Sequence, residues 1–160
     1  MRVNPTEILL RHLALLAAAW LTALIPASAQ DDSAANTRLI GELMAFHGSQ
    51  AIVEVMTTHC YETTGLDSVY KAAAENWYLR NIGFLDLADR VIERLGGAAE
   101  GQLQAAETYG GTQIMTAYNQ ADSKDSFCRA FLEQVDTGAL DINNQLPDPL
   151  KRAQEISASS

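Results

Sequence analysis

One apolar stripe with helical spacing constrains this chain more than any other feature of its sequence. From Asp67 to Gly97, apolar residues recur at intervals of three and four, the period of an α-helix that buries one face. The stripe consists of Tyr70, Ala73, Ala74, Trp77, Phe84, Ala88, Val91, Ile92 and Leu95. Because its register continues across Gly83, we predict one unbroken helix, capped by Asp67 or Ser68 and ended by Gly96-Gly97.

Three further helices are predicted by the same spacing, whereas strand signals are scarce. One covers about Asn36 to Thr63, with a stripe of Ile40, Met44, His47, Ala51 and Val55. Another covers about Ala99 to Gln120, and the next runs from Asp122 or Ser123 to Gly138. After a loop from Leu140 to Leu146, Asp148-Pro149 has the form of an N-cap followed by a proline, which predicts a short last helix to about Glu155.

Two glycine sites interrupt these patterns. Gly48-Ser49 is expected to bend the first helix. Gly110-Gly111 lies inside the third helix, where two glycines cost about 2 kcal/mol relative to two alanines. We therefore expect either a break in that helix or a neighbour packed very closely against it.

Four helices with short connections favour an antiparallel four-helix bundle with a short extra C-terminal helix. Cys60 and Cys128 are the only cysteines, and they fall at the end of the first helix and the start of the fourth. In up-down-up-down order these two ends lie at the same pole of the bundle, so a disulfide between them is expected. In the chain-entropy model, closing a loop of about 69 residues stabilises the fold by about 4 kcal/mol.

The first 29 residues have the pattern of a secretory signal peptide. Arg2 and Arg11 accompany an apolar run from Leu13 to Ile25, and a small-residue cleavage site precedes Gln30. The run is shorter than the roughly 20 residues that cross a bilayer, so no stable membrane anchor is expected after cleavage. We expect one helical domain over residues 30–160, with disordered ends at about 30–35 and 157–160. Its location would be the periplasm or the exterior, where disulfides persist.

Charge narrows the choice of partners. The chain has 20 acidic residues against 11 Lys and Arg, a formal net charge of −9. Such a surface repels nucleic-acid phosphates and anionic lipid headgroups, so neither is an expected partner. Cofactor motifs are mostly missing from the sequence, and no cofactor is expected. These features fit an exported protein that binds another protein, as an inhibitor, an immunity-type protein or an accessory subunit. The acidic charge serves solubility alone in the simpler interpretation.

A carrier of copper or of a small molecule is the second hypothesis. Met44 and His47 stand three residues apart, as do Met56 and His59, and thioether and imidazole ligands suit copper in an oxidising compartment. Twelve residues of helix place the histidines about 18 Å apart along the axis, so they cannot share a mononuclear site. Ordinary helix-face residues are the simpler interpretation of this repetition.

A small enzyme is the third hypothesis, based on His47 with Glu54 and neighbouring carboxylates. One histidine with one carboxylate is a poor catalytic signature. Because His47 lies within an apolar stripe, the simpler interpretation is a core histidine whose ring nitrogens are hydrogen-bonded.

A polar group borders the strongest stripe, where Arg80 and Asn81 follow Trp77. Trp and Arg are residue types that dominate binding energetics, so Trp77, Arg80 and Asn81 form a candidate interaction patch. Alternatively, Asn81 makes a buried structural contact that fixes the register of its helix. The sequence leaves both interpretations open.

Overall fold

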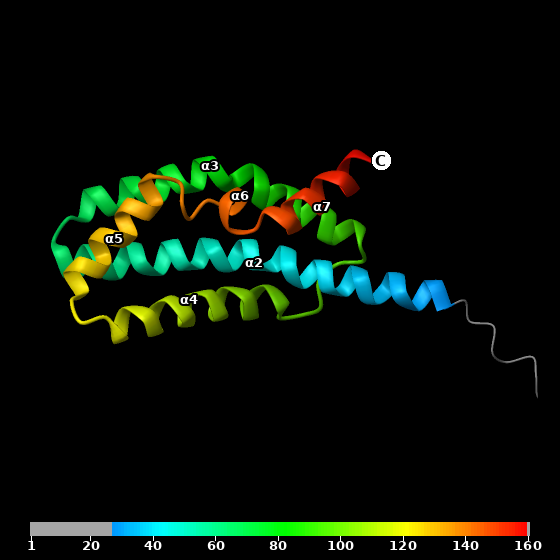
Figure 1. Cartoon of the computed structure of the whole chain (residues 1–160), viewed down its shortest axis with the longest axis horizontal. Helices are drawn as coiled ribbons and strands as arrows, with labels where there is room; N and C mark the ends of the chain where they lie inside the picture. Colours follow the sequence, from blue (N-terminus) through cyan, green and yellow to red (C-terminus); the bar gives the residue numbers. More distant parts are fainter. Residues whose placement is uncertain (1–26, 160) are drawn as a thin grey trace, which may run out of the picture. The chain divides into compact units, whose positions relative to one another are not determined.

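The computed structural model describes residues 27–159 of the chain, and residues 35–160 form one compact unit. The described part folds into helices joined by short connections (Figure 1). They are α2 (Ala27–Thr64), α3 (Asp67–Arg94), α4 (Gln102–Gln120), α5 (Lys124–Asp136), α6 (Ile142–Gln145) and α7 (Pro147–Ala158). The predicted antiparallel helical bundle with a short C-terminal helix is confirmed. Residues 1–26 of the predicted signal peptide lie outside the described part, and α2 already includes residues 30–35.

Helix α2 is the central element of the compact unit, and Figure 1 shows it between α3 and α4. Its His47 contacts α3, its Gly48 lies against α4, and its Cys60 is bonded to α5. Glu42, near the other end, accepts a hydrogen bond from Arg152 of α7. Each of the other helices longer than one turn therefore packs against α2.

Helix α3 is the single long helix that the apolar stripe predicts, and it continues through Gly83. Every residue of the stripe is buried or half-buried. Asn81, Leu85 and Leu87 are buried as well, because α3 contacts α5 and α7 in addition to α2 and so buries a wider arc. At the C-terminus, Gly96 and Gly97 have φ angles of 111° and 84°, which end the helix as expected.

The expected cap of α3 is wrong. Leu66 occupies the N-cap position, and no side chain caps the helix there. Asp67 is the first helical residue, where it forms an ion pair with Lys71 one turn later. Its carboxylate still stabilises α3, because a negative charge interacts favourably with the positive N-terminal end of the helix dipole.

Helices α5, α6 and α7 together occupy the position of a fourth helix. Ser123 caps α5 by accepting a hydrogen bond from the Ser126 amide at 3.2 Å, and Gly138, with a φ angle of 75°, follows the end of α5. The predicted loop from Leu140 to Leu146 is wrong in part, because it contains the one-turn helix α6.

The start of the last helix also differs from the prediction. Helix α7 begins at Pro147, with Leu146 as N-cap, and continues past Glu155 to Ala158. Two prolines two residues apart both suit a first helical turn, and the earlier one takes the first position. Asp148 consequently lies inside the first turn and is not the cap.

The disulfide between Cys60 and Cys128 is present, as predicted. Both cysteines are fully buried, and their Cα atoms lie 5.2 Å apart. The bond joins the C-terminal part of α2 to the first turns of α5, so it fixes the pole of the bundle at which α2 turns into α3 and α4 leads into α5.

The close approach of α2 and α4 decides how Gly110-Gly111 is accommodated. Helix α4 is unbroken through both glycines, and α2 is continuous through Gly48. A Cβ atom on Gly110 would lie 2.9 Å from the carbonyl carbon and 3.0 Å from the Cα of Gly48, closer than real Cβ contacts. Of the two alternatives, close packing is therefore the correct one, and it explains the glycines at the crossing point.

Candidate functional site

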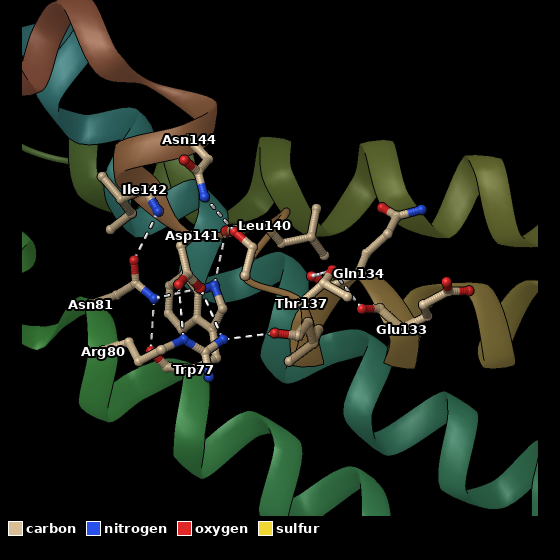
Figure 2. Close-up of polar contacts among 12 residues, drawn as sticks. Trp77, Arg80, Asn81, Glu133, Gln134, Thr137, Leu140, Asp141, Ile142 and Asn144 are labelled. Carbon is tan, nitrogen blue, oxygen red and sulfur yellow. Dashed lines mark hydrogen bonds and ion pairs between the residues drawn. The ribbon is translucent and has the colours of Figure 1, made fainter.

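The residues of the predicted interaction patch form a polar cluster with Asp141, which joins α3 to the start of α6 (Figure 2). The indole of Trp77 donates a hydrogen bond to the Leu140 carbonyl at 2.9 Å. The amide of Asn81 donates to Asp141 at 3.1 Å, and its oxygen accepts from the backbone N–H of Ile142 at 2.8 Å. Trp77 is 1% exposed and Asn81 is fully buried.

Arg80 is the third member of the patch and binds Asp141 with two nitrogens. Its Nε and Nη2 atoms lie 2.8 and 3.0 Å from the two carboxylate oxygens, and Nη2 also donates to the Val135 carbonyl at 2.7 Å. The hydrogen bond that Arg80 donates to the Asp141 carboxylate is the main cause that raises the pKa of Arg80. The Arg80 side chain is 37% exposed against 12% for Asp141, so Arg80 is the member of the polar cluster that reaches the surface.

This arrangement corresponds to the structural alternative for Asn81. The polar cluster satisfies the first amide of α6, holds the segment after α5 against α3, and places one charge pair at its solvent side. Trp77 and Asn81 are enclosed by these contacts and present little surface to a partner. The sequence drew attention to Trp77, Arg80 and Asn81 but not to Asp141, because nothing local marks a partner about 60 residues away.

The four candidate metal ligands do not meet in the structure. Met44 and Met56 are buried in the hydrophobic core, at 6% and 0% exposure. The ring of His59 lies 6.0 Å from the ring of Tyr118, and His47 is bonded to α3. Within residues 27–159, no three His, Cys, Asp or Glu side chains gather closely enough to hold a metal ion.

His47 forms a hydrogen bond with a carboxylate of another helix, and not with Glu54. Its Nε2 lies 2.8 Å from Oδ1 of Asp89 on α3, whereas Glu54 accepts a hydrogen bond from Gln50. The His47 side chain is 13% exposed and that of Asp89 is 58% exposed. This hydrogen bond ties α2 to α3.

A groove with a volume of about 540 Å³ opens between α2, α4 and the end of α6, and we call it the binding groove. The lining residues are mostly small and none is charged: Gly41, Ala45, Gly48, Ser49, Ile52, Ala105, Ala106, Tyr109, Gly110, Gln113, Gln145 and Leu146. The groove separates the N-terminal half of α4 from the junction of α6 and α7. It exists because short helices fill the position of the fourth helix. Sequence reasoning missed it because the relative placement of helices is not a local property.

The exposed surface of α4 adjoins the binding groove and is unusual for this chain. Charged residues make up 19% of the sequence, but α4 has Glu107 alone among its 19 residues. Gly110 is its one fully buried residue, and Tyr109 and Leu103 are 67% and 42% exposed. Depletion of charge with an exposed aromatic side chain is typical of the central part of a protein interface.

Comparisons of the chain with models of protein families, with curated proteins and with solved structures find no match. Among residues 27–159, no helix has the length and the apolar character that crossing a membrane requires. The function is therefore inferred from the binding groove, the surface of α4 and the disulfide.

Proposed function

We propose that this chain is an exported protein that binds a protein partner through the binding groove and the adjoining surface of α4. The observation that carries the proposal is the exposed, nearly uncharged α4, with Tyr109 at the edge of an apolar groove. Soluble surfaces normally carry about 25–35% charged residues, which keep them apart. A helix that lacks this protection is expected to be covered by a partner.

The cysteines and the N-terminus support the compartment in this proposal. A structural disulfide persists outside the reducing cytosol, and the first 29 residues have the composition of a signal peptide. Both features support a role in the periplasm or outside the cell. The partner would then be another exported protein, with this chain as its inhibitor, immunity-type protein or accessory subunit.

Site-specific photo-crosslinking tests this proposal. A photoreactive phenylalanine analogue at position 109 is expected to link the chain to one partner in the producing cells. The same analogue at Tyr78, which is 42% exposed on α3, is the matched control and is expected to give no such product. Equal products at both positions, or no product at position 109, would contradict a partner site on α4.

Carriage of a small molecule is the second candidate, favoured by the size of the groove. Its volume of about 540 Å³ lies within the usual range for small-molecule sites. Native mass spectrometry of protein purified without a tag separates the two candidates. A bound compound at one equivalent, released when Ala45→Trp fills the groove, would favour the carrier.

A further inference from the structure

We infer that the segment received by the binding groove is a helix of the partner with an apolar face and Lys or Arg residues at its flanks. The inference rests on the proposed function and adds the chemistry of the partner. It draws on two independent properties of the surface, the spacing of small residues along the groove and the distribution of charge around α4.

The small residues on the floor of the groove are spaced so that they lie on one face of a helix. Gly41, Ala45 and Gly48 follow one another at intervals of four and three along α2, so their small side chains line one side of that helix. The same stripe already accepts a helix at backbone contact, since Gly48 lies against Gly110 of α4. A second helix can lie beside α4 in this groove and insert apolar side chains at positions i, i+3, i+4 and i+7.

The charges around α4 favour a partner with positive charge. From Gly96 to Ser123 the sequence contains no Lys, Arg or His. The acidic residues of this stretch are exposed: Glu100 before the first turn of α4, Glu107 along it and Asp122 after the last turn. None of the ion pairs among the described residues involves them.

The ammonium of Lys124 lies at the last turn of α4, where it donates to the Asn119 and Ala121 carbonyls, so one cation stands against the three acidic residues. The balance around the uncharged centre remains acidic, which complements an apolar helix with basic flanks. The net charge of −9 adds long-range attraction for such a partner. The same charge disfavours the other occupants of an apolar groove. A second copy of the chain, or a fatty acid with its carboxylate, would bring like charges together.

Binding of two synthetic helical peptides tests the inference. Both carry leucines at positions i, i+3, i+4 and i+7, and they differ only in their flanking residues, lysines in one and glutamates in the other. Titration of the full chain is followed by fluorescence anisotropy of labelled peptide and by the amide NMR signals of Gly48 and Gly110. We expect the lysine peptide to bind at micromolar concentration and to shift both glycine signals, and the glutamate peptide to bind at least tenfold more weakly.

Variants of the chain separate recognition in the groove from general attraction between opposite charges. Ala45→Trp fills the groove, and Tyr109→Ala removes an exposed side chain at its edge, so that one of the two remains informative if the other perturbs folding. Each variant is expected to bind the lysine peptide at least tenfold more weakly. Neutralising the acidic residues around α4 (Glu100→Gln, Glu107→Gln and Asp122→Asn) should lower the affinity for the lysine peptide by about tenfold. A control with the same net charge neutralises exposed residues of α3 and should leave the affinity unchanged: Glu75→Gln, Asp86→Asn and Glu93→Gln.

The outcomes that overturn the inference differ from those that overturn the proposed function. Three results would refute the inference that the groove receives a helix with basic flanks. They are equal affinity for both peptides, no binding of the lysine peptide, and an equal loss of affinity in the α3 control. Displacement of the lysine peptide by laurate at equal concentration would assign the groove to a lipid. A concentration-dependent dimer in sedimentation, blocked by Ala45→Trp, would assign it to a second copy. If position 109 crosslinks to a partner segment without Lys or Arg, the proposed function stands and the basic helix fails.

Discussion

Two adjacent glycines in α4 allow a sharp test of the packing between α2 and α4. Gly110→Ala and Gly111→Ala change the same helix by the same methyl group, so both gain about 1 kcal/mol of helix propensity. A Cβ atom at position 111 would meet a methyl carbon of Val55 at 3.5 Å, an ordinary contact. At position 110 it would meet the backbone of Gly48 at 2.9 to 3.0 Å, and backbone cannot move aside as a side chain can.

The expected free energies follow from these contacts. Gly111→Ala should stabilise the fold by about 1 kcal/mol, because the propensity gain has no steric cost. Gly110→Ala should be less stable than Gly111→Ala by about 1–3 kcal/mol, the usual cost of forcing extra volume into a packed site. Propensity cancels in this difference, which therefore measures the steric term alone.

Urea unfolding followed by circular dichroism, with the disulfide intact, measures both variants against the parent chain. The slope with urea should be the same for all three proteins, since the amount of surface exposed on unfolding does not change. Equal stabilisation by the two alanines would refute the close crossing of α2 and α4, and with it the geometry of the binding groove.

Three further predictions concern the core. Asn81→Ala leaves the amide of Ile142 without its partner and should cost about 3 kcal/mol in urea unfolding, whereas the exposed Asn76→Ala should change stability by less than about 0.5 kcal/mol. Replacement of both disulfide cysteines by alanine should lower the free energy of unfolding by about 4 kcal/mol, and a loss below about 1 kcal/mol would contradict the loop-closure argument. Burial raises the pKa of Tyr70 above the ordinary 10.0, so the unfolded chain releases this proton at lower pH than the folded protein does, and stability falls as the pH rises above about 10. Tyr70→Phe should reduce that alkaline loss, and an unchanged alkaline profile would contradict this.

The spacing of residues along the sequence was sufficient to predict a helix wherever one face of that helix is buried. The stripe through Trp77 predicted α3 across Gly83, and the two cysteines predicted the disulfide, because helix order alone brings their ends together. The glycine pair in α4 was also informative, since it reduced the possibilities to a break or a close contact.

Contacts between segments far apart in the chain could not be predicted from the sequence. The sequence left Asn81 open between a buried structural contact and an interaction patch, because its partners Asp141 and Ile142 lie about 60 residues later. These partners organise a helical turn where a loop was expected. For the same reason the sequence could not identify Asp89 on α3 as the partner of His47. The binding groove depends on how far apart the helices lie, which no spacing within one helix reveals.

The position of the disulfide has a consequence for cleavage of this protein by proteases. Cys60 and Cys128 enclose α3, α4 and the exposed connection of residues 96–101, so all of this segment belongs to one covalent ring. A single cut in that connection opens the ring but leaves the two fragments attached to each other, and the helices on either side keep their neighbours. The cut would be visible on a reducing gel and invisible on a non-reducing one.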